Sequence, residues 1–347
     1  TNTSFVINLD FNNDGFQDLV VGERMIPFYY GVPASAALLR NNGQGLFDDV
    51  TAEKAPSFLK LGLLKDGLAL DYDNDDDDDL LVCGEWMDIK LFENQNGKFI
   101  EATHRVGLSG TQGLWNTLAA GDFNSDGFVD FAAGNHGLNS RFTASSTEPL
   151  LMYIHDFDGN GSPEQILCQQ VGEKSTPYVL LPDLSKQIPA VKKKYPTHDS
   201  YKDQSMIDIF GTEALKQALV LRAVDLETRV FVNRGGKKFE STSLPKEVQY
   251  TKIYAIDVLD ADGDGNLDLI TAGNHRKIKP EMGIQDAGYG QLLKGSGNGK
   301  FVSMPAYESG IYVRGEVRDI QAVETKYFRY LVFLRNSDSI KIVKQPK

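Results

Sequence analysis

Residues 122–135 read DFNSDGFVDFAAGN, and the nine-residue pattern at 122–130 recurs four more times along the chain. The other copies are DFNNDGFQD at 10–18, DYDNDDDDD at 71–79, DFDGNGSPE at 156–164 and DADGDGNLD at 260–268. Each copy has oxygen-bearing side chains at positions 1, 3, 5 and 9, and a backbone carbonyl at position 7 supplies a further oxygen. Because Ca²⁺ prefers six or more hard oxygen ligands, this spacing predicts a calcium site in each loop.

The expected ligands of the five loops follow directly from the spacing, with position 7 acting through its carbonyl. They are Asp10, Asn12, Asp14, Phe16 and Asp18; Asp71, Asp73, Asp75, Asp77 and Asp79; Asp122, Asn124, Asp126, Phe128 and Asp130; Asp156, Asp158, Asn160, Ser162 and Glu164; and Asp260, Asp262, Asp264, Asn266 and Asp268. Position 6 is glycine in four loops and Asp76 in the second, so we expect a positive φ there. We expect about five structural Ca²⁺ ions.

Two other interpretations of these loops are weaker. An EF-hand needs Glu at position 12 between flanking helices. Position 12 is Val21, Val82, Ala133 and Thr271 in four loops, and apolar runs that are typical of buried strands follow the loops. A solvated acidic turn would explain one copy, but five copies at the same place in a repeating unit argue against it.

The repeat around each loop predicts the fold. A strand enters the loop, a second leaves it, a third follows, and a Gly/Asn turn leads to a fourth that begins with an aromatic residue. Four antiparallel strands per unit are typical of a β-propeller blade, which makes the chain all-β. We place blades at about 5–51, 67–103, 117–170, 175–243, 252–304 and 313–347 of a single domain, 1–347. A two-helix insertion is expected at 183–217 in the fourth blade, and a seventh blade or an upstream segment stays open.

Composition excludes several classes of protein. The chain has 48 Asp+Glu against 36 Lys+Arg, a formal charge of −12, and no extended basic cluster that would favour nucleic acid. No run approaches the length of a membrane-spanning helix. The chain begins at Thr1 without a signal peptide, so we expect a mature or shortened form. Cys83 and Cys168 lie in apolar runs and are expected to be buried thiols.

A ligand-binding surface is expected at the face opposite the calcium loops, around the mouth of the central channel. Residues that end the second strands and begin the following loops would meet there, and aromatic, Asn, Arg and His side chains suit a sugar or a peptide. The candidates are Arg24, Glu85, Trp86, Trp115, Asn116, Asn135, His136, Asn274, His275, Arg276 and Tyr289. The alternative is structural: Trp86 and Trp115 would fill gaps between blades, and Asn135 and Asn274 would cap turns.

Catalysis has no sequence signature in this chain. HExxH, GxSxG and Walker motifs are all missing. A binding module is therefore the favoured hypothesis. The alternative is a carbohydrate-active enzyme, a lyase or glycosidase, that uses Glu85, His136, His275, Arg276 and Tyr289 at the same channel mouth.

The loop, the strand after it and the Gly/Asn turn before an aromatic resemble the FG-GAP (VCBS-type) repeat of integrin α-subunit propellers. The strings GEWM at 84–87, LWNTLAAGDFNSDG at 114–127 and GNHGLNS at 134–140, with the closing RDIQAVE and RNSD, resemble bacterial cell-surface proteins of the CRTAC1/UnbV-like branch. The resemblance implies an extracytoplasmic location, bound calcium, and adhesion or carbohydrate-related work with a glycan or protein partner. The oligomeric state stays open.

Overall fold

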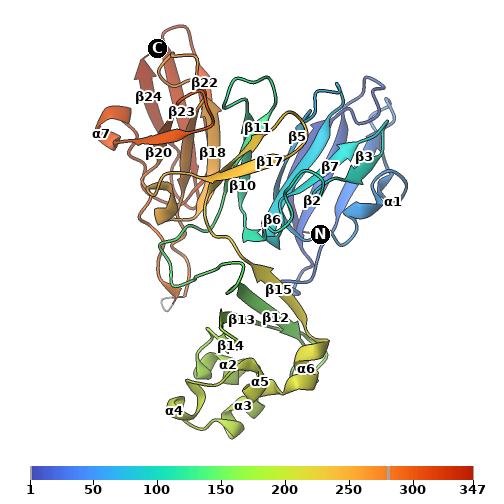
Figure 1. Cartoon of the computed structure of the whole chain (residues 1–347), viewed down its shortest axis with the longest axis vertical. Coiled ribbons are helices and arrows are strands. Elements are labelled where there is room, and N and C mark those ends of the chain that lie inside the picture. Colours follow the sequence, from blue (N-terminus) through green and yellow to red (C-terminus); the bar gives the residue numbers. More distant parts are fainter. Residues whose placement is uncertain (1, 280–281, 347) are drawn as a thin grey trace.

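The computed structural model describes residues 2–279 and 282–346 and consists mainly of β-strands (Figure 1). The strands form six antiparallel sheets, and in four of these sheets the main path is four strands that neighbour one another in chain order. A fifth sheet has three strands, and the sixth lies within an insertion described below.

Five sheets form a row. The first contains β1 (Asn2–Leu9), β2 (Asp18–Met25), β3 (Ala36–Asn41) and β4 (Phe47–Asp49). The second contains β5 (Leu63–Leu70), β6 (Asp79–Met87), β7 (Lys90–Asn94) and β8 (Phe99–Glu101), with β9 (Gly113–Leu114) paired to β6. The third contains β10 (Thr117–Gly121), β11 (Asp130–Gly134), β16 (Arg229–Asn233) and β17 (Phe239–Ser243). The fourth contains β18 (Ile253–Leu259), β19 (Asp268–Gly273), β20 (Gln291–Gly295) and β21 (Phe301–Met304), and the fifth contains β22 (Val317–Glu324), β23 (Phe328–Arg335) and β24 (Lys341–Pro346).

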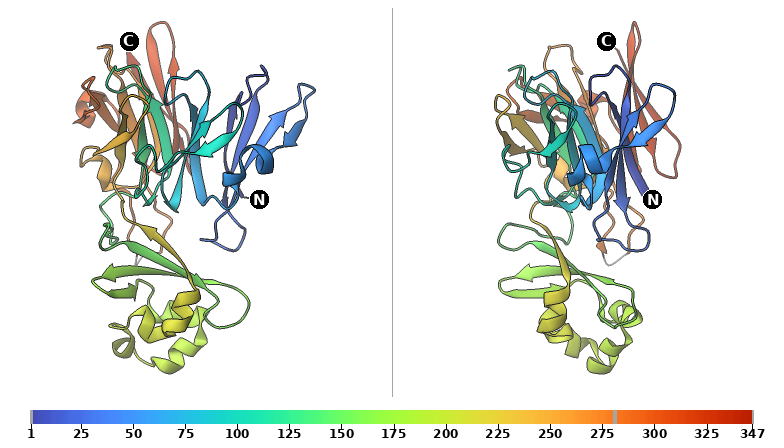
Figure 2. Two further views of the ribbon diagram at one scale, coloured as in Figure 1. Left: turned by 45° about the vertical axis from the view of Figure 1, so that its right-hand side comes forward. Right: turned by 90° about the vertical axis from the view of Figure 1, so that its right-hand side faces the viewer.

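The sheets stand side by side in chain order. Their first strands β1, β5, β10, β18 and β22 contact one another in sequence and form the inner edge of the row. The views in Figures 1 and 2 agree that the first and fifth sheets stand at opposite ends of the row and spread apart from each other. Short helical segments lie in the connections of the row: α1 (Thr51–Lys54), η1 (Pro56–Phe58), η2 (Val248–Tyr250) and α7 (Ala306–Ser309).

The third sheet corrects the expected division of the middle of the chain. Units at 117–170 and 175–243 were expected, but β11 pairs directly with β16, with Phe131 opposite Phe231. Residues 135–228 are therefore an insertion between the second and third strands of one sheet. The insertion has strands and an Asp loop of its own, so along the sequence it imitates two ordinary repeats.

The insertion (residues 135–228) is a separate small unit below the row in Figure 1. Its sheet has the order β14-β13-β12-β15, and the helices cluster beside it. The strands are β12 (Leu150–His155), β13 (Glu164–Val171), β14 (Lys174–Pro177) and β15 (Leu219–Ala223). In place of the two helices expected at 183–217 there are five short ones: α2 (Leu181–Gln187), α3 (Pro189–Lys194), α4 (His198–Tyr201), α5 (Met206–Phe210) and α6 (Thr212–Gln217).

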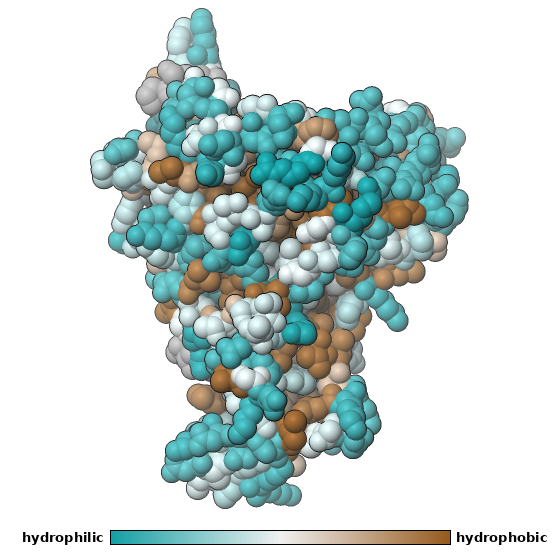
Figure 3. Space-filling model, viewed as in Figure 1, coloured by the Kyte–Doolittle hydropathy of each residue, from teal (hydrophilic) through white to brown (hydrophobic). Residues whose placement is uncertain are grey.

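Each contact between neighbouring sheets has its own apolar cluster. Phe11 and Phe92 belong to the cluster between the first and second sheets, and Phe131 and Phe231 stack within the next one, at 4.6 Å between ring centroids. A further cluster joins the insertion to the row and includes Met152. Figure 3 shows apolar residues gathered where the insertion meets the row, whereas hydrophilic residues dominate the opposite end of that face.

The two cysteines are free and buried, as the sequence predicts. Burial raises the pKa of both the Cys83 and the Cys168 thiol. Among residues 2–279 and 282–346, no helix is long and apolar enough to cross a lipid bilayer.

Candidate metal loops and ligand face

The five Asp loops share one local geometry. The position-1 carboxylate folds the loop by accepting backbone N–H groups: Asp260 accepts from Gly263 at 2.7 Å and from Gly265 at 3.0 Å. The position-5 oxygen accepts the N–H of position 7, as Asp264 does from Asn266 at 2.9 Å. Equivalent bonds occur in the other four loops.

Position 6 has the expected left-handed backbone in every loop. Its φ is +85° at Gly15, +87° at Gly127, +86° at both Gly161 and Gly265, and +69° at Asp76. The second loop thus keeps the turn without glycine, because Asp tolerates this region better than most side chains do.

The position-9 acids are buried at the start of the second strands. Asp79 is 1% exposed and accepts backbone N–H groups from Asn94 and Tyr72. Burial raises the pKa of Asp79 to about 7, against the effect of these hydrogen bonds, and the nearby Asp73 and Asp75 raise it further. In the third sheet, burial raises the pKa of Asp130 to about 6. A bound divalent cation would favour the charged form of both acids.

Carboxylate oxygens converge within 4.8 Å of one another in three loops. The groups are Asp71, Asp73 and Asp79; Asp156, Asp158 and Glu164; and Asp260, Asp262 and Asp268. In the first and third loops position 3 is Asn12 or Asn124, and its amide donates to the position-5 carboxylate. Oxygen atoms Asp73 Oδ1 and Asp18 Oδ2 are buried and lack a hydrogen-bond partner within the described part of the chain. All-oxygen donor sets with free carboxylate lone pairs fit Ca²⁺.

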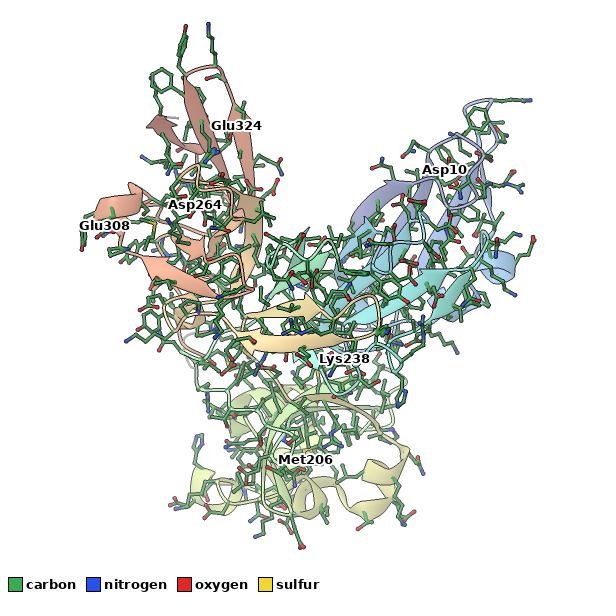
Figure 4. All side chains as sticks on the ribbon, turned by 45° about the horizontal axis from the view of Figure 1, so that its top comes forward. Asp10, Met206, Lys238, Asp264, Glu308 and Glu324 are labelled. Atoms are coloured by element: carbon green, nitrogen blue, oxygen red, sulfur yellow. The ribbon has the colours of Figure 1, made fainter. Side chains whose placement is uncertain are left out.

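Four of the loops lie together and one lies apart. Those at 10–18, 71–79, 122–130 and 260–268 connect the first and second strands of sheets in the row, so they share one end of it. Figure 4 shows Asp10 and Asp264 on the side of the row away from Met206 in the insertion. Loop 156–164 connects β12 and β13 of the insertion. The expectation that all calcium loops share one face is therefore wrong for the loop at 156–164.

Several residues predicted to bind a ligand are buried in structural contacts. Trp115 is 0% exposed, donates its indole N–H to Thr111 at 2.8 Å and packs edge-on against Phe231. Trp86 is 8% exposed, with a positive φ of +65°, and donates to Tyr30 at 3.1 Å. Both tryptophans fill gaps, one between sheets and one at the base of the insertion.

Asn135 and Asn274 tie neighbouring connections together. Asn135 is fully buried, and its amide donates to the carbonyls of Asp225 and Glu227 at the end of the insertion. Asn274, with φ +82°, donates to the carbonyls of Gly288 and Gly315. These bonds agree with the alternative interpretation, in which the two asparagines cap turns.

The two histidines differ in their surroundings. His136 is 2% exposed beside Ser140 and Gln285, and burial lowers its pKa well below the usual range, so it is neutral. His275 is half-buried and lies 3.5 Å from the Tyr254 hydroxyl through Nδ1. Burial, followed by the nearby Lys252 ammonium, lowers the pKa of His275.

An accessible pocket remains at the predicted ligand face. Arg276, Asp286, Tyr289 and Arg314 line a cavity of about 300 Å³. The ring of Tyr289 stacks on Tyr312 at 4.9 Å, and the Arg314 guanidinium lies 5.7 Å from each ring centroid. Both tyrosines are substantially exposed, at 38% and 52%. Arg276 and Tyr289 are thus brought together, and Arg24 is exposed elsewhere on this face.

Charged residues that sequence reasoning missed lie at the inner edge of the row. Lys65 pairs with the predicted Glu85 at 3.1 Å, and Arg318 stands 4.2 Å over the ring of Tyr254. Lys252 lies among them and affects the pKa values of Glu85 and both histidines. The only sequence signal that these charged residues share is their position near the beginning of the first strand of a sheet.

Comparisons with known proteins give limited likenesses. A family model described as FG-GAP-like repeat matches residues 71–133, from the second Asp loop to the third. No curated protein matches the chain. One solved structure with some similarity is the V. cholerae biofilm matrix protein Bap1, at 10% identity and a TM-score of 0.31; the match covers 96% of this chain and 74% of Bap1. Another is BBS1N in complex with ARL6DN, soaked with lead, at 11% identity and a TM-score of 0.30; the match covers 99% of this chain and 92% of that chain. TM-scores this low carry no argument about fold or function.

Proposed function

We propose that the row of sheets is a sector of β-propeller blades, that its Asp loops hold structural Ca²⁺, and that the protein is an extracytoplasmic binding or adhesion module. Glycan or protein ligands would bind at the face opposite the loops. The FG-GAP-like match at 71–133 supports the assignment of the repeat. Adjacent first strands at the inner edge of the row support the blade arrangement.

The observation that carries the calcium proposal is the repetition of one loop geometry with free carboxylate oxygens. Seventeen acids occupy ligand positions of the five loops, and five Ca²⁺ ions would bring the formal charge from −12 to −2. Each loop is contiguous and supplies its own ligands, which suits a structural ion. At the proposed extracytoplasmic location, such sites would need to bind Ca²⁺ at about 10⁻⁴–10⁻³ M.

The binding proposal rests on the accessible pocket of Arg276, Asp286, Tyr289 and Arg314. Stacked, exposed tyrosines offer an apolar face to a sugar ring, and the charged groups around them can specify its hydroxyl or acidic substituents. Asn274 supports the pocket through its hydrogen bonds to the carbonyls of Gly288 and Gly315, which also line it.

Two measurements test the proposal. Removal of calcium with EDTA should lower the melting temperature, because a site held at a hundred times its Kd contributes about 2.7 kcal/mol. On a glycan array, Tyr289→Ala should lose binding while Tyr307→Ala, a tyrosine exposed on α7, keeps it. An unchanged melting temperature would refute the calcium part, and equal binding by both variants would refute the site.

A carbohydrate-active enzyme is the second candidate. The observation that favours it is the contact between the Tyr254 hydroxyl and His275 Nδ1, because a hydroxyl and an imidazole can act as proton donor and acceptor. Release of unsaturated or reducing ends from acidic polysaccharides, abolished in His275→Ala, would select this function. Wild-type protein that binds polysaccharide without cleaving it would exclude this function.

A further inference from the structure

The inner edge of the row contains an irregularity at corresponding places in four strands. The pairing register skips Ser4 in β1, Lys65 in β5, Tyr254 in β18 and Arg318 in β22, each near the beginning of the strand. Bulges of this kind redirect a side chain and often lie next to functional sites. Since these strands are adjacent, the bulges gather side chains from several sheets at one place.

We define a basic cluster at this place as Arg24, Lys65, Lys252 and Arg318. Lys65 and Arg318 are bulge residues, whereas Lys252 directly precedes β18 and Arg24 lies in β2. Two members of the cluster have close carboxylate partners: Lys65 pairs with Glu85 at 3.1 Å and Arg318 with Glu316 at 3.1 Å. Within residues 2–279 and 282–346, Lys252 and Arg24 form no ion pair. Four cations therefore share two carboxylates in a chain that carries a net charge of −12.

Lys252 lies near more cationic than anionic side chains. Burial lowers the pKa of Lys252 to about 8; Glu85 acts in the opposite direction, but Lys65, Arg318 and Arg24 lower the pKa further. Asn116 precedes β10, the inner strand between those of Lys65 and Lys252. Its amide nitrogen is buried and has no hydrogen-bond partner among the described residues. An unused N–H donor and an unpaired ammonium both call for an oxygen acceptor.

The basic cluster also borders the pocket of Arg276, Tyr289 and Arg314. Glu316 links the two sites, because its carboxylate accepts the backbone N–H of Arg276 and the guanidinium of Arg318. His275, which contacts Tyr254, directly precedes Arg276 in the chain. Charged donors and exposed aromatic faces are thus neighbours on one surface.

We infer that the basic cluster binds the carboxylate or sulfate group of an acidic sugar, while a neighbouring sugar of the same chain lies against Tyr289. The inference rests on the proposed glycan-binding function and narrows it to acidic glycans. Lys252 supplies the main contact, Arg24, Lys65 and Arg318 surround the anion, and Asn116 donates its free N–H.

The test compares ligands that differ only in charge. Calorimetry of the calcium-loaded protein uses an oligogalacturonate, its fully methyl-esterified form, a sulfated oligosaccharide and inorganic sulfate. We expect an acidic oligosaccharide to bind at least tenfold more tightly than the ester, and its affinity to fall as salt concentration rises. Lys252→Met should weaken this binding about tenfold or more, whereas Lys98→Met, an exposed lysine in a turn, should have no effect.

The other outcomes contradict either this inference or the proposed function on which it rests. Equal affinity for ester and acid, or unchanged binding by Lys252→Met, overturns the inference but leaves the glycan-binding function intact. Binding of inorganic sulfate with neither acidic oligosaccharide also overturns it. If wild-type protein binds no ligand on glycan arrays or in protein pull-downs, the proposed function itself fails.

Discussion

Lys252 lies at a position where its positive charge destabilises the folded protein. It is half-buried, with cationic neighbours Arg24, Lys65 and Arg318 and one nearby carboxylate, Glu85. Burial, followed by the Lys252 ammonium, lowers the pKa of both His136 and His275. Taking an ammonium group out of water without a full partner destabilises the folded state.

Replacement of Lys252 by Met should therefore stabilise the ligand-free protein at neutral pH. Below pH 8 both folded and unfolded states hold the lysine proton, so the wild type bears the full penalty. Between about pH 8 and 10.5 only the unfolded state keeps it, and wild-type stability rises with pH. In chemical denaturation, we expect the free energy of unfolding of Lys252→Met to exceed that of the wild type by roughly 1–3 kcal/mol near pH 7. This difference should narrow toward pH 10. A difference that does not change with pH would contradict this explanation.

Individual residue roles were harder to predict than residue types. Asn135 and Asn274 were candidates for ligand contact, but both donate to backbone carbonyls that come from distant parts of the chain. Lys65, Lys252 and Arg318 have no common sequence pattern. Their proximity arises from strand pairing and bulges, which a single sequence does not specify.

The first two Asp loops of the row are also held by the next sheet. Asn94 of the second sheet donates to the carbonyl of Phe11 in the first loop at 2.9 Å, and Asn233 of the third donates to Tyr72 in the second loop at 2.7 Å. The backbone N–H of the same asparagine is accepted by the position-9 acid of its own sheet. A metal-filled loop would therefore stiffen two sheets.

Removal of one such tie should destabilise the protein. Asn233 is fully buried, and Asn233→Ala leaves the carbonyls of Tyr72 and Val129 without their donor. We expect a loss of about 2–3 kcal/mol in urea denaturation, because buried acceptors keep the cost of desolvation. Asn298→Ala, at an exposed turn, should change stability by less than about 0.5 kcal/mol. Equal effects of the two substitutions would contradict the role of the tie.

Loops and short strands were predictable because their determinants are local. The spacing of Asp and Gly fixes the hydrogen bonds within nine residues, and these are present in every loop. The division of residues 117–243 was not predictable in the same way. Which strand pairs with β11 depends on a contact across the whole insertion, and the insertion's own Asp loop imitates the repeat.

At the scale of the molecule, the Asp loops and the basic cluster lie at opposite ends of the row. Four Asp loops occupy one end of the row, whereas Arg24, Lys252, Arg276 and Arg314 lie toward the other end. The insertion stands at the basic end, where Lys279 pairs with Asp183 of α2 at 3.0 Å. It therefore forms one side of the surface that we assign to ligand.

The joint between insertion and row should be a stable contact. Met152 is 3% exposed and packs in the joint cluster, where Gly31 of the first sheet also approaches Ile154. Met152→Ala should cost about 2–4 kcal/mol and expose the connections to proteases. Val171→Ala, at a position 52% exposed, provides the control. If limited proteolysis and denaturation leave Met152→Ala unchanged, the insertion does not depend on this joint.

The loop-to-sheet ties give the row a mechanical property. The first and fifth sheets stand at opposite ends, so a pull on the two ends of the chain loads the sheet interfaces in series. The hydrogen bonds from Asn94 and Asn233 cross two successive interfaces between sheets. If the loops bind calcium as we propose, we expect its removal to weaken the resistance of the row to such a force.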